Sequence, residues 1–408
     1  MPGFSEPIGA PNPPDRYHRR VHGDPGDGEG GREEPLRVLM VIKCLGYGGA
    51  ERLLADMVSA GDGERFHYEV AYILRAQDAL AEVVERGGTP VHALDAVHDA
   101  DLRWMASLRR ILAAGRFDVV HFHLPYAAAL GQMVVRSLPR SHRPGVVYTE
   151  HSLWNRAPLP LKVMLRASMS GGQQMVTVSQ ASYEALPETM RRRATMVVHG
   201  VDLSRAGALV ARREELRADV RAELGVVDDD VLFLTVANLR AEKGYDVLLE
   251  AARLLAARRV PITIAAVGRG PLGPYLRARH LDLELGDRFR FLGQRTDVLR
   301  LLGGADAFVL ASHQEGLPVA LMEASSMGLP IVATAVGGVP QALRDGIDAL
   351  IVPPGDAGRV AAAMERLATD PGLRRRLGDQ AKERSAMFDV AEASRRIEEI
   401  YLRMGGES

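Results

Sequence analysis

Short apolar runs alternate along the chain with longer stretches of helical periodicity. The first five runs that predict strands lie at residues 37–42, 68–74, 118–121, 145–148 and 175–178. A fully apolar run such as 38–42 is typical of a strand in a parallel sheet with both faces covered. Helical patterns at 50–59 and 102–113 fall between the strands. This alternation predicts βαβ units wound into a parallel α/β sheet.

The same pattern repeats after a polar, arginine-rich connection at 201–213. A second α/β unit is therefore expected from about residue 206, with strands at 231–236, 262–267, 289–292, 307–310, 331–333 and 349–352. A last helix is expected over 390–404, where Ile397, Ile400 and Tyr401 follow helical spacing. This apolar stripe needs a surface to cover, which the pattern alone does not identify.

Residues 1–36 are rich in Pro, Gly, Asp and Glu and lack an apolar period, so we expect a disordered tail. About 370 residues of the 408 remain, which is room for two domains of ordinary size. The chain is 47% hydrophobic, so each half can bury a core of its own.

Charge and cysteine content exclude several classes of protein. With 51 Lys and Arg against 52 Asp and Glu, the formal net charge is −1, which argues against a dedicated nucleic-acid binder. The single cysteine, Cys44, excludes an intramolecular disulfide and fits a reducing compartment, so the cytoplasm is the expected location. No apolar run approaches the ~18–20 residues of a membrane span, and the first thirty residues lack a signal-peptide core. We therefore expect a soluble or at most peripheral protein.

Chemistry is expected at the carboxyl ends of the strands, where open α/β sheets bind ligands. The first turn contains Gly46, Gly48 and Gly49 directly before a helix, which suits close approach of an anion to backbone N–H groups. A dinucleotide fingerprint would need glycine where Glu51 stands and an acid where the second strand ends in Arg75. A dehydrogenase is thus disfavoured, while a ligand loop and a plain tight turn remain equally open.

Histidines mark the ends of two strands in the first unit. His121 and His123 are two residues apart on an extended segment and could share a metal, but spacing places no third ligand. His121 alone fits a packing role, whereas His151, beside Glu150, is placed to contact a polar substrate or transfer a proton.

The second unit carries turns suited to phosphates and sugars. Lys243 precedes Gly244 at a helix entrance, where an ammonium and N–H groups can hold a phosphate, and Gly268 and Gly270 form a similar turn. The acidic run 228–230 precedes a strand and is interpreted as solvated, so no metal site is predicted.

The most specific pattern is the pair Glu315 and Glu323, one in a loop and one inside an apolar helix. A carboxylate accepts two hydrogen bonds from a vicinal diol, which favours binding of a sugar or nucleotide. Helix capping and ion pairing are the alternative for either residue alone.

Taken in order, these segments resemble the retaining GT-B glycosyltransferases of family 4, the group 1 type. The similarity covers nearly the whole chain from residue 37 and rests on segments 48–51, 118–123, 149–151, 178–179, 200–202, 242–244, 268–272, 291–293, 337–340 and 352–356, together with the paired glutamates. The resemblance implies two Rossmann-like doubly wound domains facing across a cleft. Residues 37–205 would form the acceptor domain, 206–388 the donor domain, and 389–408 a helix crossing back to the first domain.

The resemblance also implies roles for individual residues. Lys243 would contact the diphosphate of a nucleotide-sugar donor, Glu315 the sugar hydroxyls and Glu323 the ribose, while His151 would approach the transferred sugar. The backbone of Gly48 and Gly49 would face the phosphate and the acceptor. Further donor-binding residues would be Asn238, Arg240, Gly268, Arg269, Gly270, His313, Gly316 and Leu317, and the acceptor loop would include His121 and His123.

The expected activity is transfer of a sugar, a hexose above all, from a nucleotide diphosphate donor to a glycan, lipid-linked or small-molecule acceptor, as in polysaccharide synthesis. Retention would follow from front-face attack, with no metal or other cofactor. Alternatives are a nucleotide-sugar epimerase and a non-catalytic sugar-nucleotide binder, while a phosphorylase is disfavoured by the chain length. Two departures from the family are Asn238, where arginine is common, and His199, where asparagine is common; Arg240 or Arg269 could supply the missing cation.

A weaker hypothesis is peripheral contact with an anionic membrane at the inner face. Between residues 136 and 193 there are nine Lys or Arg against three acids, and the stretch 159–169 mixes apolar and basic side chains. An ordinary solvated basic face explains the same charges.

Overall fold

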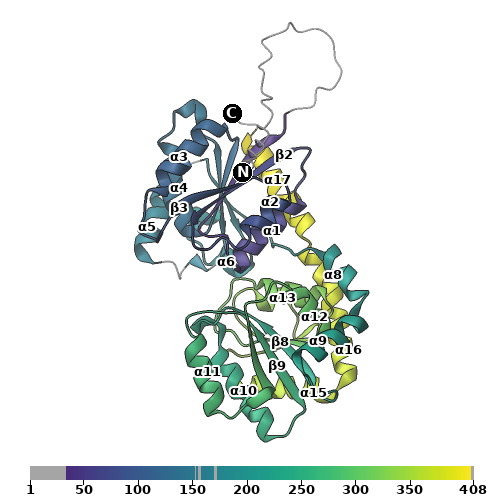
Figure 1. Ribbon diagram of the computed structural model, residues 1–408. Coiled ribbons are helices and arrows are strands. Elements are labelled where there is room, and N and C mark those ends of the chain that lie inside the picture. The colour runs from purple at the N-terminus through teal and green to yellow at the C-terminus, as the bar shows by residue number, and fades with distance from the viewer. Residues whose placement is uncertain (1–33, 152, 155–157, 170–171, 406–408) are drawn as a thin grey trace, which may run out of the picture. The chain divides into compact units, whose positions relative to one another are not determined.

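The computed structural model describes residues 34–151, 153–154, 158–169 and 172–405. The predicted tail at 1–36 lies almost wholly outside these residues. From Pro35 onward the chain forms one compact body, which contains two α/β units, each built on a parallel sheet (Figure 1).

The first sheet has seven parallel strands in the order β3-β2-β1-β4-β5-β6-β7. Its strands are β1 (Leu36–Ile42), β2 (Phe66–Leu74), β3 (Val91–Ala96), β4 (Val119–His123), β5 (Gly145–Glu150), β6 (Gln174–Thr177) and β7 (Ala194–Met196). The helices of this first α/β unit are α1 (Gly49–Ala60), α2 (Ala81–Arg86), α3 (Trp104–Gly115), α4 (Pro125–Arg136), α5 (Leu159–Ser168), α6 (Gln180–Glu184) and α7 (Glu188–Arg191), and a short 3₁₀ turn lies at Arg140–His142.

The second sheet has six parallel strands in the order β10-β9-β8-β11-β12-β13. Its strands are β8 (Val231–Val236), β9 (Ile262–Val267), β10 (Phe289–Gly293), β11 (Ala307–Leu310), β12 (Ile331–Thr334) and β13 (Ala349–Val352). The helices from here to the C-terminus are α8 (Leu203–Val210), α9 (Arg213–Leu224), α10 (Tyr245–Ala257), α11 (Gly273–Asp282), α12 (Val298–Gly304), α13 (Val319–Ser326), α14 (Val339–Ala342), α15 (Ala357–Thr369), α16 (Pro371–Arg384) and α17 (Val390–Gly405). Three 3₁₀ turns lie at Ala241–Lys243, Gly286–Arg288 and Ser385–Phe388.

The predicted fold class, two doubly wound α/β units, is confirmed. Every strand expected from an apolar run is present, to within two residues at each end. The prediction omitted β3 and β7, which form the two edges of the first sheet. β3 mixes buried and exposed positions, and β7 has only three residues, none of them buried, so neither shows a continuous apolar run.

Both faces of each sheet are buried, as the apolar runs require. Along β1, Val38, Met40 and Ile42 belong to one core cluster, and Leu39 and Val41 belong to another on the opposite face. The second sheet alternates in the same way along β8. Because side chains in a strand alternate between faces, a fully apolar strand is stable only where helices cover both sides.

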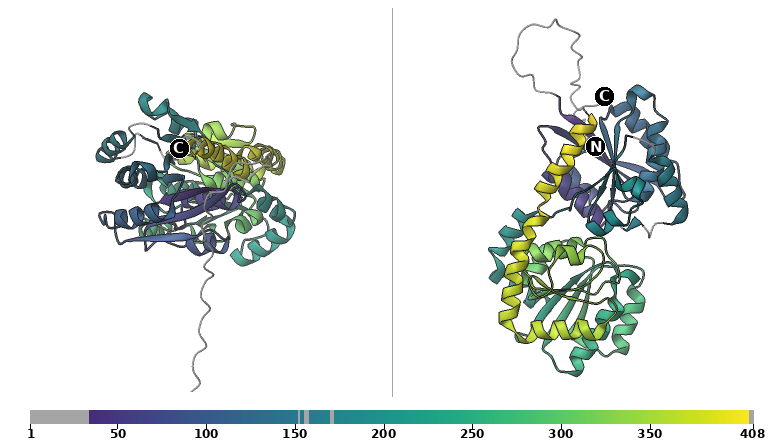
Figure 2. Two further views of the ribbon diagram at one scale, coloured as in Figure 1. Left: turned by 90° about the horizontal axis from the view of Figure 1, so that it is seen from above. Right: turned by 180° about the vertical axis from the view of Figure 1, so that it is seen from behind.

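Helix α17, drawn in yellow in Figure 2, packs on the first sheet although it follows the second unit in sequence. Ile397, Ile400 and Tyr401 are almost completely buried there. The buried Glu398 carboxylate accepts hydrogen bonds from the Tyr68 hydroxyl at 2.7 Å and from the Asp62 amide at 2.8 Å. Polar contacts therefore anchor the helix where its apolar stripe is covered.

The chain passes between the two units at two adjacent points. The Val201 amide donates to Phe388 O at 2.8 Å, and the Val390 amide donates to Val201 O at 3.2 Å. A Cβ at Gly200 would lie 2.4 Å from backbone atoms of Asp389, so only glycine fits this crossing.

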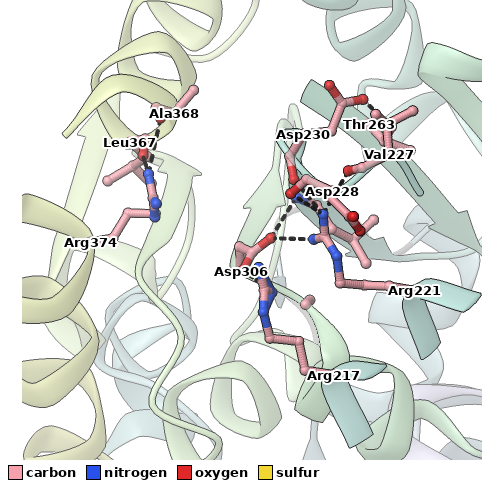
Figure 3. Close-up of polar contacts among 12 residues, drawn as sticks. Arg217, Arg221, Val227, Asp228, Asp230, Thr263, Asp306, Leu367, Ala368 and Arg374 are labelled. Carbon is pink, nitrogen blue, oxygen red and sulfur yellow. Dashed lines mark hydrogen bonds and ion pairs between the residues drawn. The ribbon is translucent and has the colours of Figure 1, made fainter. Parts of the chain in front are cut away.

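A buried arginine organises the start of the second sheet (Figure 3). Arg221 on α9 donates to Asp306 Oδ2 at 2.9 Å and to the backbone carbonyls of Val227, Asp228 and Asp230 at 2.7–2.9 Å. The Asp230 carboxylate itself accepts from the Thr263 hydroxyl at 2.7 Å. The acidic run 228–230 is thus held by Arg221 through its carbonyls, which refines the expectation of a simply solvated run.

Candidate functional site

A cavity of about 510 Å³ is lined by loops and helix starts from both units. From the first unit come the β1–α1 loop, His151 after β5 and Val178 after β6. From the second come the loops after β8, β9, β10 and β11 and the first turns of α13. The carboxyl ends of parallel strands thus face the cavity, as expected for ligand sites in such sheets.

The β1–α1 loop approaches the second unit closely. A Cβ on Gly49 would lie 3.3 Å from Val319 Cγ2 on α13, and one on Gly48 would collide with the Glu51 carboxylate. Glu51 is buried and accepts a hydrogen bond from the Cys44 thiol at 2.9 Å. Burial raises the pKa of both groups, that of Cys44 to about 12, so the thiol stays protonated.

Lys243 and Glu315 form the central ion pair of the second unit. Lys243 Nζ lies 2.8 and 2.7 Å from the two Glu315 carboxylate oxygens, and the Ser312 hydroxyl donates to Oε1 at 2.6 Å. The Glu315 side chain is 7% exposed and that of Lys243 is 21% exposed. A carboxylate this buried needs such partners, and both side chains line the cavity.

Two glycines let the loops around this pair pack directly on one another. Gly244 has φ +60°, and a Cβ there would lie 2.0 Å from Ala311 O. Gly337 has φ +54°, and a Cβ there would lie 2.0 Å from Glu315 O. Substitution at either position would displace the backbone that carries the ion pair.

Glu323 lines the cavity from α13. Burial raises its pKa to about 7, opposed first by the positive charge of Arg52 on α1, which is itself paired with Asp56 at 2.9 Å. Its carboxylate makes no hydrogen bond or ion pair among the described residues, so its oxygens can accept from a ligand.

Four histidines, His121, His123, His151 and His199, form a cluster beside the cavity. His123 Nδ1 lies 3.0 Å from His151 Nε2, and the rings of His121 and His123 are in tilted contact, with centroids 4.2 Å apart. The His199 ring meets His151 edge to face at 5.3 Å. Burial lowers the pKa of all four, and mutual repulsion adds to this for His121, His123 and His151, so the rings are neutral near pH 7.

The structure brings many of the sequence-predicted site residues to one cavity and leaves others outside it. Its lining includes Gly48, Gly49, His151, Asn238, Lys243, Gly268, Glu315, Gly316, Leu317 and Glu323. The remaining predicted site residues do not line it: Arg240, Arg269, Gly270, His313, His121 and His123.

The physical reasons differ among these residues. His313 turns toward Asp246 on α10, with Nε2 3.4 Å from the carboxylate. His121 and His123 are completely buried in β4, so neither offers a surface to a ligand in this structure. Arg240 and Arg269 are exposed.

Sequence reasoning missed three arginines that line the cavity, Arg52, Arg205 and Arg295. Arg295 is held by Asp297 at 2.7 Å and Glu223 at 2.8 Å. The Arg205 side chain makes no hydrogen bond or ion pair among the described residues, although its charge helps to lower the pKa of Asp202. Position 238, where arginine is common in the family, is Asn238 here. Cations do line the cavity, but they are Arg52, Arg205 and Arg295, and not the expected Arg240 or Arg269. One signal was available for Arg52, which follows the glycine turn by three positions.

No group of three or more His, Cys, Asp or Glu that could hold a metal ion occurs among the described residues. Over the same part of the chain, no helix is both long and apolar enough to cross a bilayer.

Comparisons with known proteins agree along the chain. The family model described as Glycosyltransferase Family 4 matches residues 47–205, and the model described as Glycosyl transferases group 1 matches residues 217–384. The D-inositol 3-phosphate glycosyltransferase of Frankia alni is 30% identical over 319 residues, spanning 70% of this chain and 74% of that protein. The alpha-D-kanosaminyltransferase of Streptomyces kanamyceticus is 31% identical over 198 residues, spanning 48% of this chain and 51% of its own.

Among solved structures, HepE of Anabaena in complex with UDP-glucose superimposes with a TM-score of 0.76. The match covers 90% of this chain and 99% of HepE at 20% sequence identity. At that identity the likeness concerns the fold.

Proposed function

Because the chain belongs to the group 1, family 4 glycosyltransferases, we propose that it moves a sugar from a nucleotide diphosphate donor to an acceptor with retention of configuration. The GT-B fold and the glycosyltransferase activity expected from the sequence are confirmed by the family matches and the structural neighbours. The observation that carries the donor assignment is the Lys243–Glu315–Ser312 constellation at the wall of the cavity.

The second unit is proposed to bind the donor. Lys243 contacts the diphosphate, Glu315 accepts from hydroxyls of the donor sugar and Glu323 accepts from the ribose. The Lys243 ammonium has three N–H groups and uses two of them on the Glu315 oxygens, which leaves one to donate to the phosphate. The Asn238 amide and the backbone of Gly268 and Gly316 complete this wall.

Charge development explains why these groups accelerate the reaction. Cleavage of the glycosyl phosphate bond leaves negative charge on the diphosphate and positive charge on an oxocarbenium-like sugar. Fixed cations stabilise the leaving group without reorganisation, and the Glu315 carboxylate faces the cationic sugar. Lys243, Arg205 and Arg295 supply this positive charge, so the mechanism needs no metal ion.

The first unit is proposed to bind the acceptor, a glycan, a lipid-linked glycan or a small molecule, with the hydroxyl attacking from the face that the phosphate leaves. The leaving phosphate takes the acceptor proton. Tyr47, Leu80, Val83 and Leu124 form an apolar wall on this side, and His151 meets the sugar.

A donor screen tests this function. The purified chain is screened by thermal shift against nucleotide diphosphates and nucleotide sugars, because a bound ligand raises the melting temperature. The stabilising donor is then incubated with candidate acceptors, and release of nucleoside diphosphate is measured. Silence with every donor and acceptor would contradict the proposal, and a changed sugar on the donor without acceptor would identify an epimerase instead.

One surface favours peripheral contact with an anionic membrane as an additional property. On α5, Leu159 is 72% and Val163 58% exposed, one turn apart, with Lys162 and Arg166 on the same helix. Apolar and basic side chains together suit a lipid surface. Co-sedimentation should rise when phosphatidylglycerol is added to phosphatidylcholine vesicles and fall in Leu159→Ser/Val163→Ser; equal binding to both vesicles would remove the idea.

A further inference from the structure

In the histidine cluster, the His151 ring contacts the cavity and the His123 ring holds His151 in place. His151 lines the cavity, while His123 is completely buried behind it and bonds His151 through Nδ1. We propose that His123 is a positioning residue that donates its Nδ1 proton to His151 Nε2, so that His151 carries its own proton on Nδ1. The arrangement of protons follows from the contacts of the two rings alone, and only its effect on catalysis rests on the proposed sugar transfer.

The bond between the two rings admits two arrangements of protons. Each neutral ring has one N–H and one bare nitrogen, so one ring donates and the other accepts. If His123 donates, its own Nε2 is bare; if His151 donates, His123 carries its proton on Nε2.

The surroundings of His123 Nε2 decide between these arrangements. This atom is buried and has no hydrogen-bond partner among the described residues. Among backbone groups, a buried N–H without an acceptor is rarer than an under-satisfied buried carbonyl, and we extend this preference to the ring nitrogens. The arrangement that leaves Nε2 bare, with His123 as the donor, is therefore favoured.

His199 shows that the cluster tolerates a bare nitrogen. Its Nδ1 lies 3.2 Å from the Val197 carbonyl, which can only accept, so Nδ1 carries the proton. His199 Nε2 is then bare, and it too is buried without a partner among the described residues.

His121 holds the His123 ring from the other side. Its two nitrogens lie 2.6 Å from the Tyr401 hydroxyl on α17 and 2.7 Å from the Thr149 hydroxyl. The fixed His121 ring packs against His123 in a tilted contact, with centroids 4.2 Å apart, and restricts its rotation. Helix α17 thereby contributes to the orientation of a cavity residue on the first sheet.

The consequence concerns what His151 can do. With Nε2 engaged by His123 and a proton on Nδ1, the ring meets an oxygen of the sugar or phosphate as a hydrogen-bond donor and does not accept a proton as a base. The proposal thus differs from the expectations from the sequence, which allowed proton transfer by His151 and placed His123 at the acceptor.

The tautomer can be observed directly. Full-length protein labelled with ¹⁵N-histidine is recorded by long-range ¹H–¹⁵N correlation, and His151→Gln identifies the signals of His151. We expect a protonated Nδ1 and a bare Nε2 on His151. A protonated Nε2 would overturn the proposal whether or not any sugar is transferred, so its failure is distinct from failure of the proposed function.

Two variants test the positioning role. In His123→Leu, which removes the donor, we expect kcat to fall about 10–100-fold with little change in the KM for the donor, and the His151 proton to leave Nδ1. His123→Asn, whose side-chain amide can donate in the place of Nδ1, should keep the Nδ1 proton on His151 and most of kcat. An unchanged kcat and tautomer in His123→Leu would contradict the role. If the leucine variant does not fold, the asparagine variant decides: a fall in kcat of about 10–100-fold together with loss of the Nδ1 proton from His151 in His123→Asn would contradict the role.

Discussion

Lys243 and Glu315 depend on each other, so substitution of either is expected to lower kcat, and loss of Lys243 is expected to raise the donor KM as well. In Lys243→Met, we expect kcat to fall about 10²-fold and the donor KM to rise, because the diphosphate loses its cation. Glu315→Gln should lower kcat similarly while keeping bonds to Lys243 and Ser312. Steady-state kinetics with the identified donor measures both effects.

Stability separates the two variants further. Lys243→Met leaves the buried Glu315 carboxylate with one partner and should lower the free energy of unfolding by about 1–3 kcal/mol, whereas Glu315→Gln should change it less. Lys382→Met and Glu383→Gln on α16, both exposed, serve as matched controls. Wild-type kinetics in Lys243→Met and Glu315→Gln would refute the assignment of the site.

Glu323 makes a contribution to stability that depends on pH. Its pKa rises from 4.5 in the unfolded chain to about 7 in the fold, so its stabilising contribution is complete below pH 4.5 and is lost as pH rises through 7. As the pH is raised from 4.5 to 8, the free energy of unfolding of Glu323→Gln should therefore increase relative to that of the wild type by on the order of 1–3 kcal/mol. Urea unfolding at several pH values measures the difference, and a gap independent of pH would contradict it.

Individual site residues were predictable only where the chain carries a local signature. Lys243 and Glu315 stand in strand-to-helix turns that glycine and proline mark in the sequence, and Glu323 lies in the helix that follows the second of these turns. Arg205 and Arg295 have no such mark. Their place at the cavity depends on which helices and loops meet there, which is not a local property.

A single side chain, that of Arg221, connects helix α9 to the start of the second sheet. Its guanidinium joins α9 to Asp306 and to three carbonyls before β8. Arg221→Met should lower the free energy of unfolding by about 3–5 kcal/mol, because it leaves Asp306 and the carbonyls with fewer donors. Arg217 also bonds Asp306 but is 41% exposed, so Arg217→Met is the matched control with a cost near 1 kcal/mol or less. Equal costs in chemical denaturation would contradict this account.

Strands were predicted well where burial is two-sided. All six strands of the second sheet and the central strands of the first appear as apolar runs, because helices cover both of their faces. The strands β3 and β7 were missed because β3 mixes buried and exposed positions and β7 has only three residues, none of them buried. Edge position alone is not the reason, since β10 and β13 at the edges of the second sheet are apolar runs that were predicted.

For the molecule as a whole, the proposed mechanism predicts activity without a metal ion. Treating the protein with EDTA and desalting it should leave the rate of nucleoside diphosphate release within about two-fold of the untreated value, because protein cations stabilise the leaving group. Addition of Mg²⁺ or Mn²⁺ serves as the control. A rate lost to EDTA and restored by either ion would refute this part of the mechanism.

The sequence by itself determined the two parallel α/β units, which follow from the hydrophobic period and the turn residues along the chain. Its ordered motifs also resemble those of the family, and the comparisons confirmed that resemblance. Only the tertiary structure decided the pairings: His123 with His151, 28 positions apart, Lys243 with Glu315, 72 apart, and Arg52 of α1 beside Glu323 of α13. Such pairings depend on which strands lie side by side and which helices face one cavity, and so on the packing of the whole chain.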